Sequence, residues 1–208
     1  MSLAAAMCGA AAAAPTPEEM GVGWTLTRLD LTVDLEPDSA GLRISGSAVL
    51  RLEGLDESDG PSLVVNGSRP ALAWVSATAR DARSELNATL EGDDAFRLAH
   101  IRFDEPRRRG ETVEVRFELE NADAAPQLLI RPDFAMASWV EGWTPFPLPR
   151  IDQHEGFTSG LLVAPGATTL RMPEGWVGLS DGALRSRQRA GGRTVEVWDL
   201  TEVRAARS

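Results

Sequence analysis

The side chains that could bind a catalytic metal are scarce, because the chain has only two histidines, His100 and His154. A catalytic zinc ion needs three protein ligands, and the usual device is a helix that presents two histidines at positions i and i+4. His154-Glu155 begins like this motif, but Thr158 follows where the second histidine would stand, and Gly156 disfavours a helix. We therefore expect no zinc catalysis in this chain. His154 is interpreted as a loop residue, and His100 as an outward-pointing residue on a strand.

Nucleophilic catalysis would need a serine or cysteine activated by a histidine and an orienting acid. No Gly-x-Ser-x-Gly elbow is present, and Ser180 in Ser180-Asp181-Gly182 fits a turn between strands. The single cysteine, Cys8, lies in an alanine-rich leader. The sequence thus predicts that this chain by itself is not an enzyme.

The formal net charge of -10 disfavours nucleic acid as a partner, because phosphate binding requires a basic face. Arg107-Arg108-Arg109, between a proline and a glycine, is interpreted as a solvated hairpin tip. The acidic clusters at Asp93-Asp94 and around Asp56-Glu57 do not match the spacing of a calcium loop. We predict no metal and no cofactor in this chain.

Residues 1–21 form an alanine-rich leader followed by prolines, which is interpreted as a signal-peptide remnant or a cloning remnant. A positively charged segment before the apolar stretch is missing, since the first arginine is Arg28. The leader favours a periplasmic or secreted location, with a cytoplasmic location as the alternative. No segment has the ~20 apolar residues of a membrane span. The absence of lysine and tyrosine suggests the composition of a GC-rich bacterium.

Strands must position whatever site exists, because the hydrophobic period is two along most of the chain. The clearest examples are residues 29–35, residues 42–52 and residues 113–119, and the first two read as a hairpin. Gly46 within the second strand predicts a bulge or a close backbone approach. Shorter strands are expected at residues 63–65, 71–79, 86–90, 95–103, 128–130, 161–164, 168–172, 176–179 and 194–200.

These elements predict an all-β fold: a twisted antiparallel β-sandwich of about ten to twelve short strands with no major helix. The one helical segment that we consider is a turn near residues 133–138. A single domain is expected over residues 22–203, and residues 204–208 are interpreted as the start of a connector.

Residues 131–160 are irregular and rich in aromatic residues and prolines, which is typical of a structured, functional loop. Its aromatic side chains, together with one from a later turn, could form a sugar-stacking platform. They could instead cover the open end of the sandwich or its junction with a further domain, which is the interpretation that we favour. The residues concerned are Trp139, Trp143, Phe146 and Trp176.

Two stretches near the end of the chain carry a more specific pattern. The first is Glu141-Gly142-Trp143-Thr144-Pro145, and the second runs from Pro173-Glu174-Gly175-Trp176 through Ser180-Asp181-Gly182 to a strand that contains Trp198. In this order they resemble the N-terminal β domain of the aminopeptidase N-like (gluzincin) zinc metallopeptidases, in the form of a divergent bacterial member. The resemblance begins near Leu29 and is generic in its first half.

The resemblance implies a non-catalytic domain that caps the substrate cleft of a catalytic domain absent from this chain. Zinc would be bound by that missing domain, whose H-E-x-x-H motif this chain lacks. The implied partners are the catalytic domain of the same polypeptide and a peptide substrate. The resemblance also implies that Glu141 contributes to substrate binding, and that Trp143 and Pro145 form a structural corner or domain interface. The alternative is an exported carbohydrate- or protein-binding β-sandwich module.

Overall fold

The computed structural model describes residues 23–38, 41–57, 60–64, 72–92, 97–106, 108–121, 128–131, 134–137, 146–147, 165–180 and 182–200. Within these ranges the secondary structure consists of strands, turns and loops, with no helix. The predicted all-β class is confirmed. None of the described segments is a helix that could span a membrane.

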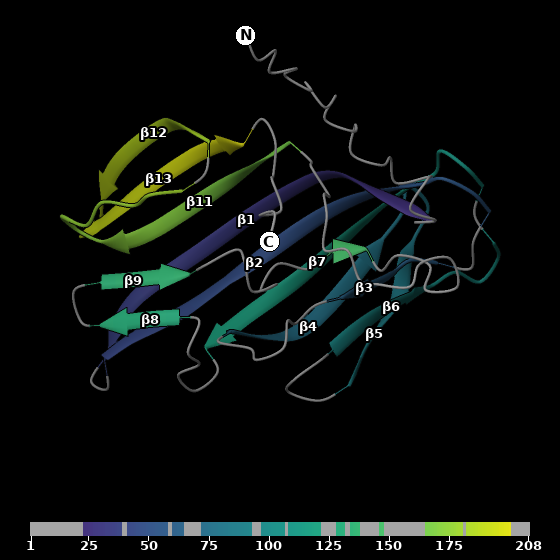
Figure 1. The fold of residues 1–208 in the computed structure, drawn as a ribbon, viewed down its shortest axis with the longest axis horizontal. Coiled ribbons are helices and arrows are strands. Elements are labelled where there is room, and N and C mark those ends of the chain that lie inside the picture. The colour runs from purple at the N-terminus through teal and green to yellow at the C-terminus, as the bar shows by residue number, and fades with distance from the viewer. Residues whose placement is uncertain are drawn as a thin grey trace, which may run out of the picture.

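The described residues form thirteen strands, most of which are labelled in Figure 1. Their bounds are β1 Trp24–Asp38, β2 Gly41–Gly54, β3 Ser62–Val64, β4 Leu72–Arg80, β5 Glu85–Gly92, β6 Arg97–Arg102, β7 Thr112–Asn121, β8 Leu128–Arg131, β9 Phe134–Ala137, β10 Phe146–Pro147, β11 Gly166–Pro173, β12 Ala183–Ala190 and β13 Arg193–Leu200.

Eleven of these strands form one sheet, in the order β10-β3-β6-β5-β4-β7-β2-β1-β11-β13-β12. Strands β8 and β9 form a separate two-stranded sheet. The predicted hairpin of the first two strands is confirmed, since Leu31 lies opposite Ala48 in an antiparallel pair. The pair of β1 and β11 is parallel, with Leu29 opposite Gly166. The parallel pair is a departure from the predicted antiparallel pattern.

The long central strands have one apolar face and one polar face, as the period of two requires. The face that we call inner carries buried residues such as Leu31, Leu50, Val115 and Phe117, each at most 2% exposed. The opposite, outer face carries the charged residues that alternate with them. Burial of the inner face drives the folding of these strands, at roughly 25 cal/mol for each Å² of apolar surface removed from water.

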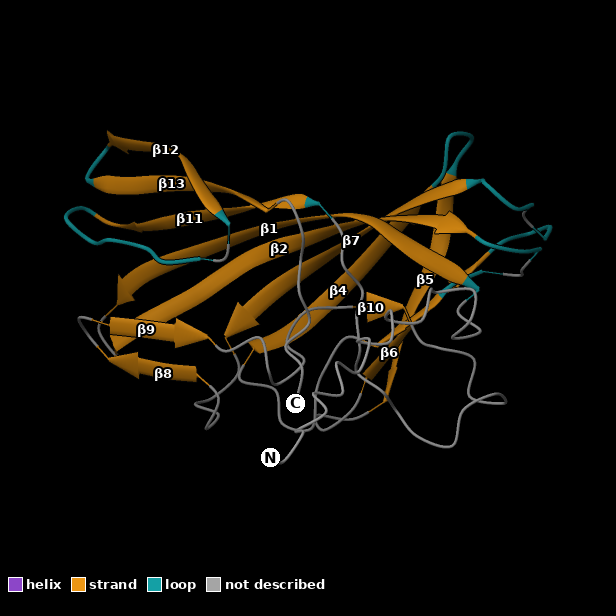
Figure 2. Cartoon of the chain, turned by 45° about the horizontal axis from the view of Figure 1, so that its top comes forward, coloured by secondary structure: helices purple, strands orange, loops and turns teal. Residues whose placement is uncertain are grey.

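A second layer covers one end of the inner face. Strand β4 pairs with β5 at only two positions, Ala79 with Leu86 and Arg80 with Glu85, and the sheet continues from there through β6 and β3. Buried Leu63, Ala99 and Ile101 of that continuation belong to the same hydrophobic core as the central strands. The continuous sheet therefore folds over itself and makes a sandwich at this end (Figure 2).

Gly46 allows β1 and β2 to approach closely. A side-chain carbon at this position would collide with the carbonyl group of Thr32 on the neighbouring strand. The predicted close backbone approach is confirmed, and it explains why a glycine interrupts an otherwise apolar row.

Two local predictions were wrong. Residues 176–179 form a loop after β11, and the strand that pairs with β13 is β12, residues 183–190. The helical turn expected near residues 133–138 is instead strand β9, which pairs with β8. In both places the apolar run is too short for its spacing to distinguish a helix from a strand or a loop.

Candidate functional site

Two of the predicted site residues, Phe146 and Trp176, fall within the described ranges. Phe146 belongs to β10, whose backbone pairs with β3 at Val64. The other four lie outside those ranges: Trp139, Glu141, Trp143 and Pro145. The functional roles of all six stay predictions. His154 lies outside them as well.

Trp176 lies in the turn that follows β11. Its backbone N–H donates to the carbonyl oxygen of Pro173 at 3.2 Å, and Glu174 N–H donates to the Gly192 carbonyl oxygen at 3.1 Å. The first bond closes the turn, and the second ties it to the turn between β12 and β13. The side chain of Trp176 is half-buried and packs against the hydrophobic core. The loop of residues 174–180, here called the covering loop, therefore folds back onto the inner face.

A buried carboxylate lies beneath this loop. Glu196 of β13 is 0% exposed and alternates with buried Thr194 on the inner face. Its carboxylate accepts a hydrogen bond from Arg187 Nε at 2.7 Å and another from Trp198 Nε1 at 3.1 Å. A buried charge is tolerated only where such partners compensate its lost hydration.

Gly178 sets the distance between the covering loop and the sheet. A carbon added at this residue would lie 2.8 Å from Glu196 Oε2 and 3.3 Å from Met172 Cε. Any larger residue would push the loop away from β11 and β13 or displace the carboxylate. Glycine at this position keeps the buried Glu196 covered.

Sequence reasoning missed Glu196. Its position in the alternating strand could have revealed it. Glu196 is two residues from Thr194 and from Trp198, so it lies on the same face of the strand as both. An acidic residue on the apolar side of an alternating strand predicts a specific partner, here Arg187.

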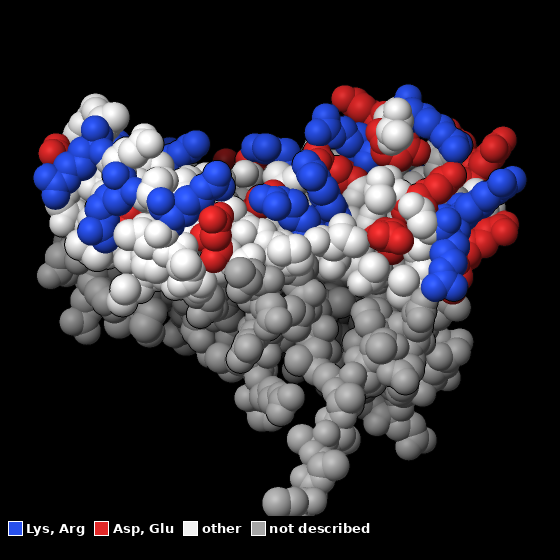
Figure 3. Space-filling model, turned by 90° about the horizontal axis from the view of Figure 1, so that it is seen from above, with Lys and Arg blue, Asp and Glu red and all other residues white. Residues whose placement is uncertain are grey.

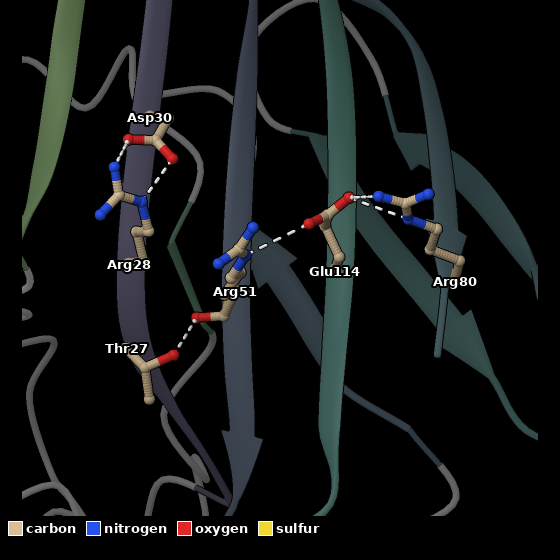
Figure 4. A network of polar contacts seen from close by, with 6 residues as sticks. All are labelled: Thr27, Arg28, Asp30, Arg51, Arg80 and Glu114. Atoms are coloured by element: carbon tan, nitrogen blue, oxygen red, sulfur yellow. Dashed lines mark hydrogen bonds and ion pairs between the residues drawn. The ribbon is translucent and has the colours of Figure 1, made fainter. Parts of the chain in front are cut away.

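The outer face carries a linked set of charges (Figure 4). Glu114 of β7 lies between two arginines, accepting from Arg51 Nε of β2 at 3.2 Å and from Arg80 Nε of β4 at 2.9 Å. Burial alone would raise the pKa of Glu114, but the hydrogen bonds from Arg80 and Arg51 outweigh it and lower the pKa. The carboxylate thus connects three neighbouring strands.

A second pair on the outer face lies within β1. Arg28 binds Asp30 through two bonds, of 2.6 Å from Nε and 2.7 Å from Nη2. The hydrogen bond to Asp30, with the attraction of its charge, raises the pKa of Arg28. Farther along the strand, Asp34 binds Arg193, whose other terminal nitrogen is 3.3 Å from Glu36. These ion pairs link residues of β1 to one another and to β13, and they give the outer face a polar surface.

His100 lies on β6, as predicted, opposite Thr89 of β5. Its side chain is 24% exposed, with Nε2 3.8 Å from a carboxylate oxygen of Glu91. Among the residues described, no group of three His, Cys, Asp or Glu side chains could hold a metal ion.

Comparison with known proteins finds a likeness in fold. No protein-family model matches the sequence, and no curated protein matches it. A crystal structure of an M1 zinc metallopeptidase from Deinococcus radiodurans, a point mutant bound to a Tyr-Ser-Ala substrate, matches with a TM-score of 0.56 and 16% identity over 88% of this chain and 40% of that chain. Another from the same organism gives a TM-score of 0.57 and 13% identity over 86% and 39% of the two chains.

A two-domain M1 zinc metallopeptidase mutant bound to L-tryptophan matches with a TM-score of 0.56 and 16% identity, over 88% of this chain and 41% of that chain. At these identities the likeness concerns the fold. The chain spans about two fifths of the length of the structures it matches, at 39% to 41%.

Proposed function

We propose that this chain is the non-catalytic N-terminal β domain of a zinc aminopeptidase-like protein. The observation that carries the proposal is the fold likeness to M1 zinc metallopeptidases, which extends over 88% of this chain and 40% of the other. A domain of that relative size leaves room in the longer proteins for a separate catalytic part. The order of the Trp-x-Pro, Pro-x-Gly-Trp and Ser-x-Gly elements points to the same family.

In this proposal the domain caps one side of the substrate cleft. Zinc, held by the catalytic domain, would polarise the peptide carbonyl and activate water. The β domain would exclude solvent and hold the substrate in place, which lowers the barrier through positioning. Glu141 would bind the α-ammonium group of the peptide, and the surface around Trp143, Pro145 and Trp176 would face the catalytic domain. Export to the periplasm or beyond is part of the same proposal.

The first test is an aminopeptidase assay on the longest natural product of the gene, with and without a zinc chelator, beside the 208-residue chain. We expect chelator-sensitive hydrolysis in the long form only. Chelator-sensitive hydrolysis by the 208-residue chain would contradict the non-catalytic assignment. No hydrolysis in either would sink the peptidase proposal and leave the alternative of a carbohydrate- or protein-binding module, to be examined on glycan and peptide arrays.

The role of Glu141 has its own test in the long form. Glu141→Gln removes a charged hydrogen-bond acceptor, so KM should rise about tenfold while kcat changes little. Glu105→Gln, an exposed carboxylate in the loop after β6, is the matched control and should leave KM unchanged. A Glu141→Gln enzyme with unaltered KM would remove that residue from the substrate site.

A further inference from the structure

We propose that the free edge of β12 binds an extended acidic segment of a partner protein, which adds to the sheet as a further strand. The proposal does not depend on the proposed function. Three independent observations support it: the open backbone edge, the basic residues of that edge, and the exposed Leu184 on it.

The backbone edge is open in the described part of the chain. Strand β12 is the last strand of the sheet and pairs with β13 on one side only (Figure 1). Its eight residues leave alternate N–H and C=O groups directed away from β13. No described backbone group outside the sheet ladders bonds to them. An edge of this kind can accept an extended peptide through main-chain hydrogen bonds.

The charge of the edge is opposite to that of the whole protein. Residues 183–193 contain four arginines and no acidic residue, in a chain of net charge -10. Figure 3 shows basic side chains gathered at the end of the molecule where β11, β13 and β12 lie. The arginines are Arg185, Arg187 and Arg189 of β12 and Arg193 at the start of β13. Arg185 lies 3.6 Å from Asp199, and Arg193 pairs with Asp34 and Glu36, so these two charges are already partly compensated within the chain.

The pairing register places two of these arginines on the inner face of β12. Arg187 lies opposite Glu196, and Arg189 lies opposite Thr194. Residues two apart on a strand are roughly 6.7 Å apart on one face, so an incoming strand can set acidic residues at i and i+2 beside them. Arg187 already binds Glu196, whereas no ion pair is formed by Arg189 within the described residues. Arg189 is therefore the principal contact.

An exposed apolar residue, Leu184, lies on the edge strand itself. Within the described ranges, the large hydrophobic side chains that are exposed are Val177 at 66%, Leu179 at 89% and Leu184 at 41%. All three lie in the covering loop or at the start of β12. Leu184 shares the inner face with Arg187 and Arg189, because it lies opposite Trp198. A partner strand would thus meet an apolar residue at one end and arginines at the other.

These features also disfavour the pairing of this edge with the same edge of a second copy of the chain. Exposed charges and a bulge between Leu184 and Ser186 protect an edge from pairing with itself, because two such strands would bring arginine against arginine. An acidic strand meets no such repulsion. Nucleic acid would neutralise the arginines but would use neither the backbone groups of β12 nor Leu184.

The test uses a peptide with blocked ends and the sequence Leu-Thr-Glu-Thr-Glu-Thr-Leu, whose palindromic order suits either strand direction. Titration into the full 208-residue chain, followed by amide NMR, should shift the signals of residues 183–190. A peptide with lysine in place of glutamate should bind at least about fivefold more weakly. Binding should also weaken with added salt.

Backbone pairing is separated from simple charge attraction by N-methylation. Methylating alternate amides that face β12 should abolish binding, while methylating the other set should not. If both methylated peptides bind as well as the parent, or if an oligothymidylate competes equally, strand addition is wrong. Concentration-dependent dimerisation through this edge would also overturn it.

The protein-side test is Arg189→Glu, which should weaken peptide affinity about fivefold or more. The matched control is Arg102→Glu, an exposed arginine on β6, which carries the same charge change and should leave affinity within twofold. Equal losses in the two variants would show that net charge alone governs binding. Because both residues are exposed, thermal melts are expected to match wild type.

Discussion

The two ends of the sheet cover the same apolar face in different ways. At one end a second layer of strands supplies Leu63, Ala99 and Ile101, each at most 2% exposed. At the other end, within the described residues, the covering loop packs over β11 and β13, with buried Glu196 and Thr194 beneath it and Val177 and Leu179 exposed. At the first end the apolar face is covered by other strands of the same sheet. The second end carries the features of a contact surface.

The largest effect is expected at the end closed by strands. Ile101→Ala removes a buried side chain from the core and should lower the free energy of unfolding by about 3 kcal/mol, measured by urea denaturation. Ile101→Val, which removes one methylene, should cost about 1 kcal/mol. Similar losses for both variants would mean that this layer does not close the core.

At the other end, the buried pair can be broken directly. Glu196→Ala leaves Arg187 and Trp198 without their acceptor and opens space beneath the covering loop. Arg187 is 41% exposed and can regain water, so the expected loss is about 2 kcal/mol rather than that of a fully buried pair. Glu196→Gln keeps an acceptor and should lose less. If Glu196→Ala were neutral, the loop would be held by packing alone.

The covering loop itself is tested through Gly178→Ala. The added carbon meets Glu196 and the side chain of Met172, so we expect a loss of about 1 to 2 kcal/mol in the free energy of unfolding. Val177→Ala, in the same loop but 66% exposed, is the control and should change stability by less than about 0.5 kcal/mol. Equal effects would show that the loop does not rest on the sheet.

The smallest effect concerns the outer face and pH. The pKa of Glu114 is lower in the folded chain than its ordinary value of 4.5, because Arg80 and Arg51 favour the charged form despite burial. Its contribution is therefore fully present above that ordinary value and is lost as pH falls through the lowered folded pKa. Glu114→Gln should lose up to about 1 kcal/mol at neutral pH and show a flatter acid decline. An unchanged acid profile would contradict this linkage.

The sequence predicted the centre of the fold better than its second end. The hairpin of β1 and β2 and strand β7 were predicted because their apolar residues alternate over many positions, and Phe117 and Leu50 are buried as expected. Strand β12 was not predicted, because it is an edge strand exposed on both faces and its sequence therefore has no apolar alternation. Residues 176–179 were wrongly predicted as a strand, because this loop contains several apolar residues, of which Trp176 packs against the core.

Some features of the candidate site could be predicted from the sequence, and others could not. The turn at Pro173–Trp176 was suggested by proline and glycine, which punctuate strands for local steric reasons. The pairing of Glu196 with Arg187 joins two strands, so it depends on a register that local patterns do not determine. The parallel pairing of β1 with β11 has the same origin, because it links segments far apart in the chain.

That parallel pairing has a consequence for the order of events during synthesis. Leu29 in the middle of β1 contacts Gly166, so 137 residues (166 minus 29) must emerge before β1 gains its second neighbour. At ordinary translation rates this takes on the order of ten seconds. Throughout that interval the nascent chain exposes one side of a strand that later lies inside the sheet. A chaperone that shields this side would have its greatest effect before Gly166 leaves the ribosome.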